Sequence, residues 1–573
     1  MVQGGLPNPC TANRFMSIAI SIEDLTFTYQ GNERPTLKNI NGQIKDGTFV
    51  VVMGHGGAGK STLCCSFNAL IPKFFRGKYQ GRVLVNGQEV ARRQVAEMSR
   101  LVGLVLQDFE AQLFSTNVEL EMAFGPENHC LLRPEIERRI QRYLTFVGLE
   151  KLRHREPASL SGGQKQRLAI GSVLALEPKI LVMDEPTTDL DPFGREEVLS
   201  VAKSIREEGR TLLIVDHEPE TAVTADQIWL IRDGQIVSQG PPSEILVDGP
   251  TMESCGIKTL PMVELFHSMN WPGNPLTVER AIELIQRHNL TQRCERKVAT
   301  VSTGHIKGSP ILKAEELRYI YPTYHVEALR GIDLSIREGE FIAILGQNGS
   351  GKTTLAKHFN GLLKPTSGRM LVQNKPTAEY SHRELSRWVG YVFQNPDHQI
   401  FARTVAEEVG FGLKMQGEIL KTIEKRMAEV LEVVGLQGYE QKVPFALTKG
   451  ERQRVAVASV LAAQPQVIIL DEPTTGLDYR HQRDMMEMLK RLNRYGHTII
   501  IITHSMWVAA EYANRTIVMK DGFILSDGPT RTVFAEENQL AEASLSPPSL
   551  VRLSNWLGTE ALTVQDMVQE LKK

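Results

Sequence analysis

Short runs of apolar residues occur along the chain as two similar sets. They occupy residues 49–53, 180–183 and 212–215 in the first half, and residues 341–345, 467–470 and 499–502 in the second half. Uninterrupted apolar runs of this length are typical of strands that are buried on both faces of a parallel sheet. Each half is therefore predicted to contain an α/β core built on a parallel sheet.

Between residues 394 and 448 the apolar spacing changes to that of a helix. One face of the predicted helix carries Ile423, Met427, Val430, Leu431 and Val434. Apolar residues three and four positions apart lie on one side of an α-helix. We therefore predict a helical subdomain that is inserted into the sheet core.

The second half repeats the first, motif by motif. Tyr29 and Lys60 recur at an offset of 292 as Tyr321 and Lys352. At an offset of 287, four more residues recur: Gln107, Ser161, Asp184 and His217 as Gln394, Thr448, Asp471 and His504. A five-residue difference between positions 68 and 81 accounts for the change of offset. A repeat this long indicates two homologous domains rather than a solenoid.

The repeat also sets the predicted domain boundaries, because Leu276-Thr277-Val278 recurs near the chain end as Leu562-Thr563-Val564. Each domain is therefore followed by a small helical tail. The predicted order is a disordered lead 1–15, a first domain 16–245, its tail 246–293, a linker 294–310, a second domain 311–535 and its tail 536–573.

Composition narrows the function classes. The chain has 65 basic and 67 acidic residues, so no large electrostatic footprint for nucleic acid is expected. No apolar run approaches the roughly 18 residues that span a bilayer, so a membrane role would come through a partner. The six scattered cysteines and the absence of a signal-peptide pattern at the N-terminus favour a reduced, cytosolic compartment.

Two glycine-rich segments fit the phosphate-binding pattern G-x-x-x-x-G-K-[ST], and each follows a predicted strand and precedes a predicted helix. Their backbone N–H groups would surround phosphate oxygens, the lysine would reach the β- and γ-phosphates, and the hydroxyl after it would hold Mg²⁺. The candidate nucleotide-binding residues are Gly54, Gly56, Gly57, Gly59, Lys60, Ser61 and Thr62, and then Gly346, Asn348, Gly349, Gly351, Lys352, Thr353 and Thr354.

An Asp-Glu pair follows another predicted strand in each half, as Asp184-Glu185 and Asp471-Glu472. The aspartates suit a Mg²⁺ site. Glu185 and Glu472 are placed to polarise an attacking water.

The segment Leu160-Ser161-Gly162-Gly163-Gln164 lies 23 residues before Asp184. Together with the phosphate loops it resembles the signature of the ATP-binding cassette (ABC) superfamily. The resemblance implies two tandem P-loop NTPase domains, each with a RecA-like core, an antiparallel β subdomain and a helical insert. It further implies that the two domains pair head to tail, so that the signature of one half binds the ATP of the other. The residues that would contact ATP from the first signature are Ser161, Gly162, Gly163 and Gln164. Those from the second signature are Thr448 and Gly450.

The same resemblance assigns roles to further pairs of residues. Tyr29 and Tyr321 would stack on adenine, with packing on the strand as the alternative. Gln107 and Gln394 would contact Mg²⁺ and signal to partners. The resemblance also implies that Asp191 and Asp478 cross the domain pair, and that His217 and His504 contact the γ-phosphate.

A narrower resemblance is to the energy-coupling-factor importers of vitamins and transition metals, carried by the segment from Phe393 to Phe401 and, more loosely, by 106–114. It implies a transmembrane coupling protein, a substrate-binding membrane protein and a peripheral location on the cytoplasmic face of the membrane. A docking groove would be lined by Leu113, Phe114, Ile400 and Phe401, for which internal packing is the alternative.

Two other functions stay open. Twin-cassette proteins that act on ribosomes or DNA share the core motifs, but they typically carry a long charged linker, zinc modules or coiled coils, which are not visible in this sequence. An exporter ATPase is disfavoured by the residues around Gln394.

The two ATP sites are expected to differ. The second half has Leu447-Thr448-Lys449-Gly450-Glu451 at the signature, and Gly476 where the first half has Asp189. A carboxylate at Glu451 would repel a nearby γ-phosphate, and this signature would face the site of Lys60. We therefore expect the site of Lys352 to be the stronger hydrolase.

Overall fold

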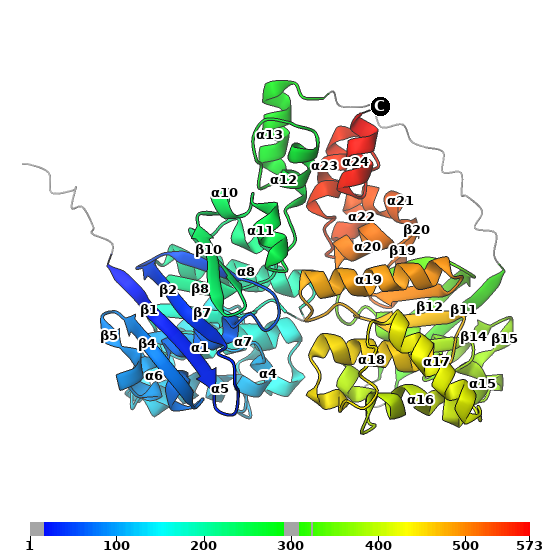
Figure 1. Cartoon of the computed structure of the whole chain (residues 1–573), viewed down its shortest axis with the longest axis horizontal. Helices are drawn as coiled ribbons and strands as arrows, with labels where there is room; N and C mark the ends of the chain where they lie inside the picture. Colours follow the sequence, from blue (N-terminus) through cyan, green and yellow to red (C-terminus); the bar gives the residue numbers. More distant parts are fainter. Residues whose placement is uncertain (1–16, 189, 292–308, 323–324, 573) are drawn as a thin grey trace, which may run out of the picture. The chain divides into compact units, whose positions relative to one another are not determined.

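The computed structural model describes residues 17–188, 190–291, 309–322 and 325–572. The chain forms two compact units, one of Met1–Thr187 with Glu197–Ile245 and the other of Thr188–Glu196 with Leu246–Lys573. The predicted lead and nearly all of the predicted linker lie outside the described residues. Figure 1 shows both units and labels many of their elements.

The first unit contains two sheets. The four-stranded antiparallel sheet has the order β2-β1-β4-β5, with β1 (Ile18–Tyr29), β2 (Leu37–Lys45), β4 (Gly77–Val85) and β5 (Gln88–Glu89). The six-stranded sheet has the order β10-β9-β3-β8-β7-β6, with β3 (Phe49–Met53), β6 (Val102–Val105), β7 (Ile180–Asp184), β8 (Thr211–Val215), β9 (Gln227–Arg232) and β10 (Gln235–Gly240). Its central strands are parallel.

Helices of the first half connect these strands. They are α1 (Lys60–Phe67), α2 (Leu70–Lys73), α3 (Val95–Met98), α4 (Phe109–Gln112), α5 (Val118–Asn128), α6 (Arg133–Phe146), α7 (Gly162–Leu174), α8 (Pro192–Glu207), α9 (Pro219–Ala222) and α10 (Pro242–Ile245), with short 3₁₀ turns at Val90–Arg92, Glu150–Leu152 and Pro157–Ser159. Helices α4 to α7 form the predicted insert between β6 and β7.

The second unit repeats both sheets. Its antiparallel sheet has the order β12-β11-β14-β15, with β11 (Pro310–Tyr321), β12 (Val326–Arg337), β14 (Ser367–Val372) and β15 (Lys375–Pro376). Its six-stranded sheet has the order β16-β17-β18-β13-β19-β20, with β13 (Phe341–Leu345), β16 (Val389–Val392), β17 (Val467–Asp471), β18 (Thr498–Ile502), β19 (Arg515–Lys520) and β20 (Phe523–Pro529).

The helices of the second half follow the same order. They are α14 (Lys352–Phe359), α15 (His382–Leu385), α16 (Val405–Met415), α17 (Leu420–Val433), α18 (Lys449–Leu461), α19 (Tyr479–Arg494), α20 (Met506–Tyr512), α21 (Thr530–Ala535) and α22 (Glu537–Glu542), with 3₁₀ turns at Thr377–Glu379, Pro396–His398 and Pro444–Ala446.

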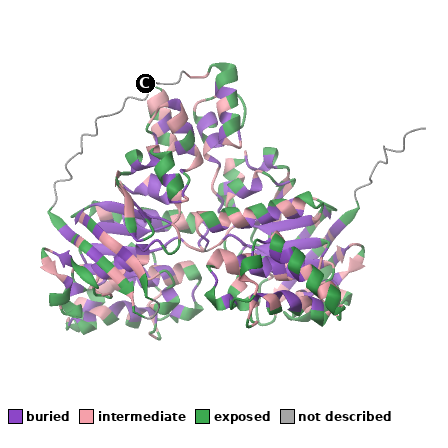
Figure 2. Ribbon diagram, turned by 180° about the vertical axis from the view of Figure 1, so that it is seen from behind, coloured by how far each residue is buried: buried purple, intermediate pink, exposed green. Residues whose placement is uncertain are grey.

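The apolar patterns account for these elements. Every residue of β3, β7, β8, β13, β17 and β18 is buried. One face of each parallel sheet packs with the antiparallel sheet and with the helix that follows the phosphate loop. In the second half the other face packs against helices. Figure 2 shows this burial concentrated in the sheets. In α17, Ile423, Val430 and Leu431 face the core and Met427 packs partly against it, which confirms the predicted helical face.

Both helical tails lie in the second unit and share one hydrophobic cluster. The first tail contains α11 (Gly249–Ser254), α12 (Pro261–Ser268) and α13 (Val278–His288), and the second contains α23 (Ser549–Leu557) and α24 (Val564–Leu571). Phe266 and Leu553 are both fully buried in this cluster. The repeated Leu-Thr-Val supplies helix N-caps, since the side chains of Thr277 and Thr563 accept hydrogen bonds from the first turns of α13 and α24.

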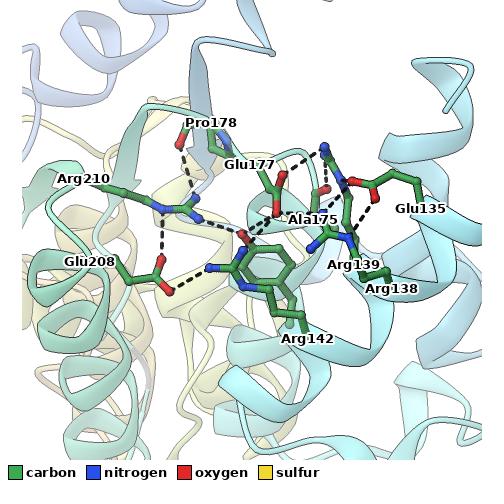
Figure 3. Close-up of polar contacts among 10 residues, drawn as sticks. Glu135, Arg138, Arg139, Arg142, Ala175, Glu177, Pro178, Glu208 and Arg210 are labelled. Atoms are coloured by element: carbon green, nitrogen blue, oxygen red, sulfur yellow. Dashed lines mark hydrogen bonds and ion pairs between the residues drawn. The ribbon is translucent and has the colours of Figure 1, made fainter.

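An ion-pair network fastens α6 of the first half to the sheet core (Figure 3). Glu177, which follows α7, pairs with Arg139 at 3.0 Å and with Arg142 at 3.2 Å. Arg142 also pairs with Glu208 at 3.1 Å, and Arg210 donates to the hydroxyl of Tyr143 at 2.7 Å. The second half has Gln464 at the position of Glu177 and Glu429 at that of Arg142, so this network belongs to the first half.

Within the described part of the chain, the helices fall short of the length and apolar character that crossing a bilayer requires.

Candidate functional site

Both phosphate-binding loops have the geometry that their glycines predict. Gly59 and Gly351 precede α1 and α14 with φ of 103° and 102°, a region that favours glycine. A Cβ at Gly59 would lie 2.9 Å from the carbonyl oxygen of Thr36, so the close approach of the backbone also requires glycine.

The two loop lysines are buried and close their own loops. Lys60 Nζ donates to the carbonyls of Gly54 and His55, both at 2.9 Å. Lys352 Nζ donates to the carbonyls of Gly346 and Gln347, both at 2.7 Å. Each ammonium group therefore lies against the backbone of its own loop, where the sequence predicts that phosphate binds.

The Asp-Glu pairs lie at the ends of β7 and β17, beside these loops. Glu185 and Glu472 adopt left-handed φ values of 49° and 50°. Backbone strain of this kind in a residue other than glycine is concentrated at functional sites. The strain occurs at equivalent positions of both halves, which indicates a shared requirement for the carboxylate to point in one direction.

In each half, the glutamate of the Asp-Glu pair contacts the histidine that was predicted to lie in the same site. His217 Nε2 lies 2.7 Å from Glu185 Oε1, and His504 Nδ1 lies 2.9 Å from Glu472 Oε1. Burial lowers the pKa of His217, but the hydrogen bond and charge of Glu185 outweigh it and leave the pKa above its ordinary value. Gln107 Nε2 donates to Glu185 Oε2 at 2.7 Å.

The aspartates and loop hydroxyls form an oxygen cluster in each half. Thr353 Oγ1 donates to Asp471 Oδ2 at 2.9 Å, and the hydroxyl of Ser61 hydrogen-bonds to Asp184. Burial raises the pKa of Asp184 to about 6 and that of Asp471 above its usual range. Among the residues described, the buried Oδ1 of Asp184 finds no hydrogen-bond partner. A buried carboxylate oxygen beside a hydroxyl fits Mg²⁺, which prefers oxygen ligands.

A pocket of about 560 Å³ gathers most predicted residues of the second half. Its lining includes Tyr321, Asn348, Gly349, Gly351, Lys352, Thr353, Thr354, Gln394, Asp471, Glu472 and His504. The hydroxyl of Tyr321 lies 3.1 Å from Thr354 Oγ1, and that of Tyr29 lies 3.1 Å from Thr62 Oγ1. Both tyrosines therefore lie beside the phosphate loop of their own half.

The signature residues begin α7 and α18. Ser161 and Thr448 are N-caps, each in a capping box with the residue three positions on. Thr448 and Gly450 are not part of the pocket lining of their own half. Gly162, Gly163 and Gln164 follow Ser161 in the first turn of α7.

Glu451 is turned back onto its own helix start. Its Oε2 accepts from the N–H and the hydroxyl of Thr448, both at 2.9 Å, and its Oε1 accepts from Tyr439 at 2.9 Å. Burial raises the pKa of Glu451, but these hydrogen bonds outweigh it and leave the pKa below its usual range. The charge is thus dispersed over three donors, which weakens the repulsion expected from the sequence.

Lys449 lies over Gly476, where a Cβ would come within 2.4 Å of Nζ. The glycine at 476 therefore leaves room for the lysine that replaces the glycine of the first signature. Asp189, the counterpart of Gly476, lies outside the described residues.

Three further features were missed from the sequence. Tyr391 donates its hydroxyl to Asp471 Oδ2 at 2.8 Å. Asp216 accepts from the backbone of His217 at 2.7 Å and of Glu218 at 3.0 Å, which holds the histidine loop. Glu121 and its counterpart Glu408 are buried and bind a loop backbone in each insert. The Asp immediately before the histidine, and an acid six residues after Ser115 and after Ala402, were available as local signals. Tyr391 and Asp471 are 80 positions apart, so no local pattern joins them.

Known proteins resemble this chain over nearly its whole length. A family model described as ABC transporter matches residues 37–188 and 329–475. A protein of Caldanaerobacter subterraneus is 51% identical over 97% of this chain and 99% of its own length, and one of Methanosarcina acetivorans is 40% identical over 96% and 94%. Both are named, provisionally, as ABC transporter ATP-binding proteins.

A solved structure covers one half. CbiO1 from Clostridium perfringens, described as part of the ABC transporter complex CbiONQ, is 40% identical over 43% of this chain and 98% of its own, with a TM-score of 0.38.

Proposed function

Because this chain belongs to the ABC transporter family of ATPases, we propose that it is the energising subunit of an energy-coupling-factor type importer for a vitamin or a transition-metal ion. Closure of the two cassettes on ATP would drive a transmembrane coupling protein that works with a substrate-binding membrane protein. The chain would lie on the cytoplasmic face of the membrane.

The site residues take the following proposed roles. Lys60 and Lys352 bind phosphate oxygens, and Glu185 and Glu472 polarise the attacking water. Mg²⁺, when bound, would neutralise phosphate charge, and the residues that would hold it are Ser61, Gln107 and Asp184 in the first half and Thr353, Gln394 and Asp471 in the second. His217 and His504 orient the two glutamates and reach the γ-phosphate.

A matched pair of exposed aromatic patches supports a membrane partner. In the first insert Phe114 and Phe124 are 62% and 45% exposed, with ring centroids 4.5 Å apart. In the second, Phe401 and Phe411 are 61% and 40% exposed, with centroids 4.7 Å apart. Contiguous exposed apolar groups mark interaction surfaces, whereas single exposed apolar residues are common.

These patches are held in place by buried acids. Glu121 Oε2 accepts from the N–H groups of Phe114 and Ser115 at 3.1 and 2.8 Å. Glu408 Oε2 accepts from the N–H groups of Phe401 and Ala402 at 3.0 and 2.9 Å. The same buried acceptor holds the same loop in both halves, which indicates that the fold maintains the exposure of the phenylalanines.

A groove of about 640 Å³ adjoins the second patch and is lined by Phe393, Phe411 and Met415 among others. Ile400, which was expected to line it, is 3% exposed and packs in the core, so the alternative of internal packing holds for this residue. Phe401 carries the exposed apolar surface instead.

The test is co-purification from detergent-solubilised native membranes, with mass spectrometry of the captured proteins. A small polytopic membrane protein should come with the wild-type chain and be lost from the Phe114→Asp, Phe401→Asp double variant. Phe523→Asp, at another exposed phenylalanine, is the matched control and should retain it. Capture of ribosomes or DNA-bound complexes without a membrane protein would overturn the transport role and leave the ATPase assignment intact.

A further inference from the structure

We propose that Tyr391 is a positioning residue for the metal-binding carboxylate of the second site, and that the first site lacks this support because Leu104 stands at the equivalent position. The inference rests on the proposed binding of Mg²⁺ by Asp471. It concerns the chain itself and does not depend on which partner the chain energises.

Tyr391 contacts Asp471 directly, and the packing around Tyr391 holds its side chain in one orientation. The Tyr391 hydroxyl donates to Asp471 Oδ2 at 2.8 Å. Tyr391 lies in β16, which pairs in parallel with β17 immediately before Asp471, and its side chain is largely buried. Its ring packs edge-to-face on Phe393 with centroids 5.1 Å apart. The strand pairing and the ring packing therefore fix the direction of the hydroxyl.

Two donors converge on one oxygen of Asp471. Thr353 Oγ1 approaches Oδ2 at 2.9 Å from the phosphate loop, and Tyr391 approaches it from the neighbouring strand. A tyrosine hydroxyl is protonated at neutral pH, so Tyr391 is a hydrogen-bond donor there. If Mg²⁺ bound Thr353, Tyr391 would still hold the carboxylate.

The first half has a leucine at the position of Tyr391. Leu104 lies in β6 beside β7, in the register that places Tyr391 beside β17. A leucine side chain cannot donate a hydrogen bond, and the Oδ1 atom of Asp184 is buried without a hydrogen-bond partner in the part of the chain that the structure describes. Asp184 is therefore less constrained than Asp471 before metal binding.

Groups that hydrogen-bond to metal ligands orient them, and their loss typically weakens metal binding by about 10-fold to 100-fold. The loss of metal affinity on removal of the Tyr391 hydroxyl is expected to lie at the lower end of this range, because Thr353 also orients the carboxylate. We expect about tenfold weaker metal binding in Tyr391→Phe. The second site of the wild-type chain should likewise bind the metal about tenfold more tightly than the first.

The experiment uses the full chain with Mn²⁺ as the probe, followed by electron paramagnetic resonance in the presence of a non-hydrolysable ATP analogue. Lys60→Ala weakens nucleotide binding at the first site, so that the signal reports the second. In this background, Tyr391→Phe should weaken Mn²⁺ binding about tenfold while metal-free binding of the analogue stays unchanged. Tyr380→Phe, which removes a hydroxyl bonded to the carbonyl of Val372, is the matched control and should bind Mn²⁺ like its parent.

Equal Mn²⁺ affinity of Tyr391→Phe and its parent would overturn the role of Tyr391. A parallel loss of metal-free nucleotide binding would show a general structural effect and would also overturn it. Equal affinities of the Lys60→Ala and Lys352→Ala chains would overturn the difference between the sites. If neither the Lys60→Ala nor the Lys352→Ala chain bound Mn²⁺, the proposed metal site would be overturned. The transport role is tested separately, by co-purification with membrane proteins.

Discussion

His217 Nε2 lies 2.7 Å from Glu185 Oε1, so the glutamate proposed to polarise water is paired with the histidine proposed to reach the phosphate. Gln107 binds the other oxygen of Glu185 at 2.7 Å. The three residues lie on separate loops of one unit, and each controls where the carboxylate points. This triad makes both the stability and the chemistry of the first site dependent on protonation.

The pair of His217 and Glu185 predicts a stability that depends on pH. The folded-state pKa of His217 is raised, so the pair contributes stability that is fully present below about pH 6.5 and lost as pH rises through the folded pKa. We expect His217→Gln to destabilise the first unit by about 1.5–3 kcal/mol at pH 6 and by less at pH 8. Thermal unfolding at both pH values measures this, and an equal penalty at the two would contradict it.

Metal binding at the first site is predicted to weaken in mild acid. Burial raises the pKa of Asp184 to about 6, so below that value a proton competes with the metal for the carboxylate. In a Lys352→Ala chain with an ATP analogue, Mn²⁺ affinity should be constant from pH 8 to 7 and fall progressively below about pH 6. Affinity that stays flat down to pH 5 would show that Asp184 is not a ligand.

The ionised carboxylate of Asp184 should destabilise the metal-free protein. Its folded pKa lies above that of an unfolded aspartate, so the metal-free protein loses stability as pH rises from about 4 to 6. Asp184→Asn should therefore raise metal-free stability at pH 7 by roughly 1–3 kcal/mol, while first-site turnover is lost. Denaturant unfolding with chelator measures the gain, and a less stable variant at pH 7 would argue against a buried, destabilising charge.

The two sites are predicted to hydrolyse ATP unequally. Glu472→Gln should reduce the turnover of the full chain more than Glu185→Gln, because Tyr391 orients Asp471 in the second site and Leu104 leaves Asp184 without that contact. The position of Glu451, bonded to its own helix start, makes charge repulsion the smaller part of this difference. Steady-state phosphate release from the two variants measures this difference. An equal loss of turnover in both would contradict the predicted asymmetry.

The ion-pair network of the first insert is predicted to stabilise that half alone. Glu177→Gln removes the charge that pairs with Arg139 and Arg142, and should destabilise the first unit by about 1–2 kcal/mol, less at high salt. The second half carries Gln464 and Glu429 at the positions of Glu177 and Arg142. Glu429→Gln removes only an exposed pair with Lys425 at 3.8 Å, so it is the control and should change the stability of its unit little. Unfolding at low and high salt compares the two variants, and an unchanged melting profile for Glu177→Gln would contradict the prediction.

Sequence alone determined the features that depend on local patterns. Uninterrupted apolar runs predicted the central strands, and a 3.6-residue spacing predicted α17. The glycines of the phosphate loops follow from backbone geometry, which a short segment decides by itself. The duplication then supplied a second copy of each motif, which is why loop, acid pair and histidine were recognised together.

Tertiary structure decided which distant side chains meet. Tyr391 and Asp471 are 80 positions apart, and no local pattern indicates that a hydroxyl on β16 reaches a carboxylate at the end of β17. Burial separates Ile400 from its exposed neighbour Phe401, although both are apolar residues of one motif. A motif specifies the backbone that a few residues adopt, whereas orientation, burial and pKa depend on everything packed around a side chain. These properties are therefore set only when the strands and helices of the whole domain come together.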